Sequence, residues 1–152
     1  MTVLRDFQRP GTALLSRKKP AVTHAPRGAR ILIVEDDPQL RELYRRALVA
    51  SRYNVSIAAD GLTALTLIET APPDVVVLDL GLPRISGWDV YRDLRARQET
   101  KTLPIIIATG QELRDIPLGD LACFLEKPVE PVRLVTAVDC ALCAGRNSPQ
   151  WS

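Results

Sequence analysis

The sequence is poor in the residues that many catalytic and metal sites use, because its 152 residues include one histidine and three cysteines. With His24 alone, a histidine catalyst and a multi-histidine metal site are excluded. The odd number of cysteines and the absence of a recognisable signal peptide indicate reduced thiols in a cytoplasmic protein. Cys140 and Cys143 form a C-x-x-C pair, but within a helical pattern rather than at a helix N-terminus. We therefore predict small core-facing side chains there instead of a redox or zinc motif.

Long apolar runs and phosphate-binding loops are missing too. No stretch approaches the roughly 18 apolar residues of a transmembrane helix, so we expect no contact with a membrane. Neither a G-x-G-x-x-G motif nor a P-loop follows the first predicted strand, which argues against a nucleotide-binding site.

Charge is distributed unevenly along the chain. Residues 1–30 hold seven Lys or Arg and one acid, a net charge of +6, whereas residues 31–152 hold thirteen and seventeen, a net charge of −4. We predict a flexible basic arm over 1–29, a folded domain over 30–145 and a polar tail over 146–152. A transit peptide, or an arm that touches nucleic acid or anionic lipid, is the less favoured alternative. The acidic folded domain itself is not expected to bind nucleic acid.

Apolar runs alternate with helical patterns from residue 30 onward. Predicted strands cover 30–35, 54–59, 74–79, 104–109 and 122–126, and helices follow each of them. On the first helix an apolar stripe includes Leu43, with Arg41 on the opposite, solvent face; Leu62 begins the stripe of the second. The alternation indicates the α/β class, a doubly wound five-stranded parallel sheet in the flavodoxin-like order 2-1-3-4-5. The stretch 110–121 leaves room only for a shortened fourth helix.

Polar residues stand where four of the predicted strands end. Glu35 and Asp36 close the first, Asp79 the third, Thr109 the fourth and Lys127 the fifth. Because the carboxyl ends of parallel strands line one crevice, these groups are expected to converge. Carboxylates so close together need a cation, and their hard oxygens suit Mg²⁺. A carboxylate beside such a metal can accept a phosphoryl group.

In this arrangement, and in the residues around it, the chain resembles the receiver domain of two-component response regulators over residues 30–145. The resemblance implies that Asp79 is the phosphoacceptor, that Asp36 binds Mg²⁺ directly, Glu35 mainly through water and Gly81 through its carbonyl. It implies that Thr109 and Lys127 contact the phosphoryl oxygens. The matching stretches are Ile31–Pro38, Val77–Pro83, Gly87, Ala108–Gly110 and Phe124–Pro128.

The same resemblance implies further roles. Phe124 is expected to change position together with Thr109 as a conformational switch. The Lys127–Pro128 bond is expected to be cis, as the family has it. The local pattern, rather than the resemblance, assigns Asp37 to helix capping instead of metal binding, because Pro38 follows it at the first helical position. Side chains at Gly81 and Gln111 are those expected to tune dephosphorylation, because they are best placed to orient the attacking water.

One part of the chain departs from the family. The interval from Thr109 to Lys127 is 18 residues, shorter than the family's usual spacing, and it contains Pro117. This shortening affects the face formed by the fourth helix, the fifth strand and the fifth helix, the family's usual output and dimerisation surface.

The predicted function is a stand-alone phosphoacceptor without enzymatic activity beyond its own phosphorylation and dephosphorylation. Its predicted partners are a sensor histidine kinase or histidine phosphotransfer protein and an unnamed downstream protein, and the protein is expected to be a monomer or a phosphorylation-dependent dimer. A receiver-fold docking module regulated without phosphate is the alternative. A Mg²⁺-dependent phosphatase of the haloacid dehalogenase type is disfavoured, since Gly81 stands where such enzymes need a second acid.

Overall fold

Five parallel strands form one sheet in the order β2-β1-β3-β4-β5, which confirms the predicted fold class and strand order. The computed structural model describes residues 28–110 and 123–146, with side chains through Ala144. Each strand lies within about one residue of its predicted bounds. The strands are β1 (Arg30–Val34), β2 (Asn54–Ala58), β3 (Val75–Leu78), β4 (Ile105–Thr109) and β5 (Cys123–Glu126).

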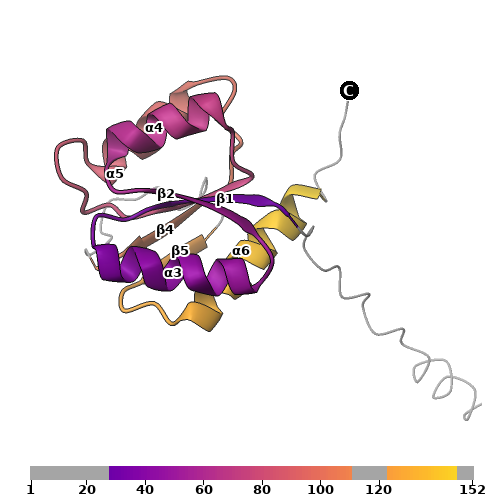
Figure 1. Cartoon of the computed structure of the whole chain (residues 1–152). Helices are drawn as coiled ribbons and strands as arrows, with labels where there is room; N and C mark the ends of the chain where they lie inside the picture. Colours follow the sequence, from indigo (N-terminus) through magenta and orange to yellow (C-terminus); the bar gives the residue numbers. More distant parts are fainter. Residues whose placement is uncertain (1–27, 111–122, 147–152) are drawn as a thin grey trace, which may run out of the picture.

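Helices cover both faces of this sheet. Figure 1 shows α3 (Pro38–Ala50) and α6 (Pro131–Arg146) on one face, and α4 (Gly61–Thr70) and α5 (Gly87–Ala96) on the other. The predicted fourth helix of the alternation falls within 110–121, almost all of which lies outside the described residues. No helix in the described part of the chain is long and apolar enough to cross a membrane.

Successive side chains of each strand point to opposite faces of the sheet, and this divides the core into two layers. In β1, Ile31 and Ile33 pack with α3 and α6, whereas Leu32 and Val34 pack with α4 and α5. Both sides of β1, β3 and β4 are therefore covered, which explains their almost unbroken apolar sequences. In these three strands, buried polar groups are therefore found only where the strands end.

Side-chain caps start the helices at that edge. Asp37 accepts hydrogen bonds from the backbone N–H groups of Gln39 and Leu40, at 2.8 and 3.3 Å, so its predicted capping role is confirmed. Asp60 and Ser86 cap α4 and α5 in the same way.

Two leucines predicted to face the core are exposed instead. Leu43 on α3 is 43% exposed and Leu62 on α4 is 63% exposed. On α4 the buried positions are Gly61, Ala64 and Ile68, and Leu62 is turned about 100° away from Gly61. The first turn of α4 therefore contacts the core through the small residues Gly61 and Ala64, which the hydrophobic pattern alone did not indicate.

The prediction for the C-x-x-C pair was also wrong in part. Cys140 is exposed and Cys143 is half-buried. The buried stripe of α6 includes Leu134 and Val138, and Cys140 lies two residues past Val138, on nearly the opposite side of the helix.

Candidate functional site

The pairing of β1 with β3 brings the first two acids together. Val34 is aligned with Leu78, so Glu35 and Asp79, the next residues, leave the two strands side by side. The backbone N–H of Asp79 donates to the Val34 carbonyl at 3.0 Å. Glu35 and Asp79 are 2% and 6% exposed, so two carboxylates lie buried at the carboxyl edge of the sheet.

Backbone packing holds Asp79 in place from the other side. The N–H of Gly81 donates to Asp79 Oδ1 at 3.1 Å, and the N–H of Gly87 donates to the Leu80 carbonyl at 3.1 Å. A Cβ atom at position 87 would lie 2.1 Å from the Asp79 carbonyl oxygen. Only glycine allows the start of α5 to approach Asp79 this closely.

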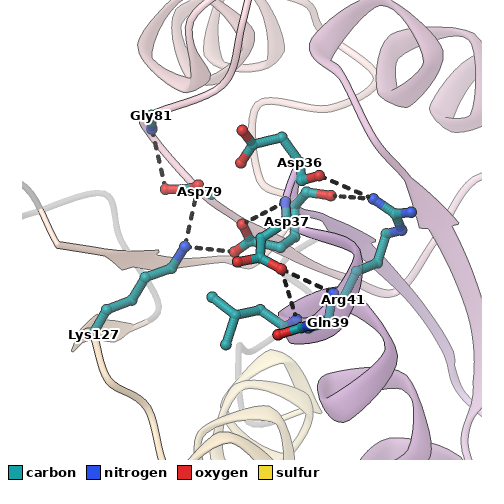
Figure 2. Close-up of polar contacts among 9 residues, drawn as sticks. Asp36, Asp37, Gln39, Arg41, Asp79, Gly81 and Lys127 are labelled. Atoms are coloured by element: carbon teal, nitrogen blue, oxygen red, sulfur yellow. Dashed lines mark hydrogen bonds and ion pairs between the residues drawn. The ribbon is translucent and has the colours of Figure 1, made fainter.

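Lys127 provides the positive charge at this edge. Its ammonium Nζ lies 2.6 Å from Glu35 Oε2 and 3.2 Å from Asp79 Oδ2. Figure 2 shows Lys127 directed toward Asp79. Its backbone N–H donates to the Thr109 carbonyl at 3.0 Å, which ties the loop after β5 to the end of β4. The Lys127–Pro128 bond is cis, as the resemblance implied.

Burial and charge shift the pKa values of this group. Burial raises the pKa of Glu35 to about 7; Asp79 adds to the rise, and the hydrogen bond and charge of Lys127 oppose it. For Lys127 burial alone would lower the pKa, but the contacts with Glu35 and Asp79 outweigh it, so the pKa is raised. Burial of the negative charge of Glu35 is thus the most unfavourable electrostatic feature of the site, and Lys127 offsets only part of it.

The acids that could hold a metal ion are Glu35, Asp36 and Asp79. One carboxylate oxygen of each lies within 4.8 Å of the others. Two of these acids are buried and Asp36 is exposed, so a cation could enter from solvent on the Asp36 side. An all-oxygen set of this kind fits Mg²⁺, which retains several of its waters.

Arg41 is a site residue that the sequence reasoning placed on the wrong face. It is half-buried, and its Nη1 donates to the backbone carbonyls of Glu35 at 3.0 Å and Asp36 at 3.4 Å. These bonds hold the turn between β1 and α3 that carries both acids (Figure 2). The only signal was the position of Arg41 one turn past the capping residue Asp37.

The remaining predicted residues are placed as follows. Thr109 ends β4 and is 1% exposed. Phe124, on β5, is half-buried against the core layer of α4 and α5. Gly81 is exposed beside Asp79, and Gln111 lies outside the described residues.

Comparison with known proteins gives a consistent result. The family model of the response regulator receiver domain matches residues 31–139. The response regulator MprA of Mycobacterium sp. (strain KMS) is 45% identical over 83 residues, which are 55% of this chain and 35% of that protein. MprA of Mycobacterium avium (strain 104) is 42% identical over 83 residues, again 55% of this chain and 36% of that protein. The chain therefore matches only about a third of the length of these relatives.

Solved structures extend the likeness over most of the chain. The chemotaxis response regulator CheY4 of Vibrio cholerae superposes with a TM-score of 0.68 at 26% identity, covering 75% of this chain and 98% of that one. A response regulator receiver domain protein from Clostridium thermocellum gives a TM-score of 0.70 at 25% identity, covering 78% and 97%.

Proposed function

The chain belongs to the response regulator receiver domain family, and from that premise we propose that it accepts a phosphoryl group on Asp79 in a Mg²⁺-dependent step of a two-component phosphorelay. The observation that carries the proposal is the buried Asp79 carboxylate, held between Lys127 on one side and the Glu35–Asp36 pair on the other. The proposed donor is a sensor histidine kinase or a histidine phosphotransfer protein. The signal then passes to a partner protein that docks on the phosphorylated domain.

In the proposed step an Asp79 carboxylate oxygen attacks the phosphorus of a phosphohistidine. An O–P bond forms, the N–P bond breaks, and its electron pair stays on the imidazole nitrogen of the donor. Asp79 Oδ2 is the oxygen now paired with Lys127, so the ammonium lies where it can follow the phosphoryl oxygens as they arrive. We assign the Thr109 hydroxyl to a second phosphoryl oxygen.

Bound Mg²⁺ supplies charge neutralisation between the carboxylates and the phosphoryl oxygens. We assign its direct protein ligands to Asp36, Asp79 and the Gly81 carbonyl, and its water-mediated contact to Glu35. The acid cluster supports this assignment because its oxygens already lie within 4.8 Å of one another.

We further propose that Thr109 and Phe124 form the conformational switch, and that Gly81 and Gln111 set the lifetime of the phosphoryl group. Gly81 has no side chain and Gln111 carries no charge, so neither holds a water strongly in line with the phosphorus. The aspartyl phosphate is therefore expected to last minutes or longer. Gly81→Asn should shorten the decay measured after donor removal, because the added amide can orient water.

Incubation of the full chain with acetyl phosphate and Mg²⁺, followed by intact-mass measurement, tests the central proposal. One phosphoryl group should be gained, and it should be lost in Asp79→Asn or when the metal is chelated. Asp74→Asn is the matched control, because Asp74 is an exposed aspartate just before β3, at the opposite end of the same strand. If the unchanged protein gains no phosphoryl group, the docking module regulated without phosphate becomes the better account.

A further inference from the structure

Tyr44 is a buried polar residue that the proposed mechanism does not use. It lies on α3, is 1% exposed, and its hydroxyl has no hydrogen-bond partner among the residues that the structure describes. Buried phenols normally find a partner, because an unpaired buried hydroxyl costs free energy. Such an atom needs an explanation, and for Tyr44 its surroundings provide one.

The position of Tyr44 on α3 favours a side chain directed toward the acid cluster. Helical side chains lean toward the helix N-terminus, and α3 begins at the carboxyl edge of the sheet, immediately after Glu35 and Asp36. Tyr44 also belongs to the core layer under that edge. This layer includes residues that precede four site positions by one or two places: Ile33, Val77, Ala108 and Leu125.

The electrostatic environment of Tyr44 agrees with this placement. Its pKa is raised, first by burial; the positive charge of Lys127 lowers it, and the carboxylates of Glu35, Asp79 and Asp37 raise it further. The phenol therefore interacts with the charges of Lys127, Glu35 and Asp79, although it lies in the core.

We propose that Tyr44 is a positioning residue whose hydroxyl donates a hydrogen bond to the Glu35 carboxylate when a divalent cation occupies the acid cluster. In the metal-free structure Lys127 donates a hydrogen bond to that carboxylate, with 2.6 Å between Nζ and Oε2. A cation among the acids would repel the Lys127 ammonium and weaken its contact with Glu35. A neutral hydroxyl can stay beside the same carboxylate without that repulsion and keep it oriented, as outer partners of metal-binding carboxylates do.

This inference rests on the proposed function, and calorimetric titration of the full chain with Mg²⁺, without any phosphodonor, tests it separately. Tyr44→Phe should raise the Mg²⁺ dissociation constant about tenfold. Tyr91→Phe is the matched control, since Tyr91 also has a buried hydroxyl without a partner in the described residues, but it packs in the α4/α5 layer. It should leave the dissociation constant within about twofold of the original.

Two further measurements separate positioning from packing. The metal-free denaturation midpoint of Tyr44→Phe should equal or slightly exceed that of the unchanged protein, because no hydrogen bond is lost there. In a Glu35→Gln background the same change should have little further effect on Mg²⁺ binding, because its partner carboxylate is gone.

An unchanged dissociation constant in Tyr44→Phe overturns the inference while leaving phosphorylation of Asp79 intact. Equal losses in the Glu35→Gln and original backgrounds also overturn it, since Tyr44 would then act independently of Glu35. Failure of the unchanged protein to bind Mg²⁺ removes both this inference and the proposed function.

Discussion

Glu35 and Glu42 each pair with a basic side chain at nearly the same distance, 2.6 Å to Lys127 and 2.7 Å to Arg45. Their pKa values nevertheless move in opposite directions. Burial raises that of Glu35 to about 7, whereas hydrogen bonds from Arg45 and Arg46 lower that of Glu42 to about 2. Glu35 is 2% exposed and the Glu42 side chain 40%, so desolvation decides the difference.

The two clusters differ in whether they need the tertiary fold to form. The exposed cluster, Glu42 with Arg45 and Arg46, forms within one helix at i, i+3 and i, i+4 spacing. The buried cluster, Glu35 with Asp79 and Lys127, joins three strand ends and costs desolvation that its two ion pairs to Lys127 do not fully offset. Such a cluster is better explained by chemistry than by stability.

The largest expected effect comes from the backbone contact that only the buried cluster needs. Gly87→Ala should destabilise the protein by about 3 kcal/mol or more, because the new Cβ overlaps the Asp79 carbonyl and Leu80 Cα at 2.1 and 2.6 Å. Urea unfolding followed by circular dichroism measures this loss.

Gly110→Ala is its control. Among the residues that the structure describes, a Cβ there meets only Lys127 Cβ, at 4.0 Å, so stability should change little or rise slightly. Equal stability of both variants would mean that α5 does not pack against Asp79 as described.

Removal of Lys127 should be the next most damaging change. Lys127→Met leaves Glu35 and Asp79 buried without their cation, which should cost roughly 2–3 kcal/mol in urea unfolding at neutral pH. Adding Glu35→Gln should recover part of the loss, because one uncompensated charge is removed. Arg45→Met, which breaks a contact of similar length in the exposed cluster, should shift the urea midpoint by less than roughly 0.3 M. A loss in Arg45→Met as large as in Lys127→Met would contradict the distinction between the clusters.

The sequence predicted the acids of the buried cluster but not its pairing. Apolar runs that end in Glu35 and Asp79 indicate strands and a shared edge, and local spacing identified Asp37 as a cap. The contact of Lys127 with Glu35 joins residues 92 apart and depends on strand order and on the path of the loop after β5. The strand ends predicted that Lys127 lies at this edge, and the resemblance implied a contact with phosphoryl oxygens, but neither predicted its pairing with Glu35.

The rotation of each helix about its axis was the other feature that the sequence did not predict. The hydrophobic pattern predicted that Arg41 faces solvent, yet its guanidinium donates to the backbone carbonyls of Glu35 and Asp36. Cys140 reads as a core residue and is exposed. Both depend on how far each helix is turned about its axis, which is decided by the packing partners rather than by the helix's own sequence.

Mg²⁺ should stabilise the protein through the buried cluster and not through the exposed one, with a smaller free-energy change than the substitutions above. At ten times its dissociation constant it should stabilise the unchanged protein by about 1.4 kcal/mol, because it binds the folded acid cluster only. Asp36→Ala should abolish this response, and with one repelling charge gone its metal-free stability should not fall. Glu42→Ala, which removes an acid of the exposed cluster, should keep the full response. Thermal melting with and without Mg²⁺ measures all three, and a normal response in Asp36→Ala would rule out the metal site proposed here.

The smallest expected effect is the pH dependence of the exposed cluster. The folded-state pKa of Glu42, about 2, lies below its ordinary value of 4.5, so its pairing stabilises the fold above that ordinary value and stops doing so as the pH falls toward 2. The urea midpoints of the unchanged protein and of Glu42→Gln should therefore differ slightly at pH 6 and converge as the pH falls toward 2. Added salt at pH 6 should reduce the difference in the same way, because the pair is exposed to solvent. A difference that grows on acidification would show that Glu42 is held by burial, as Glu35 is, and the contrast between the two carboxylates would fail.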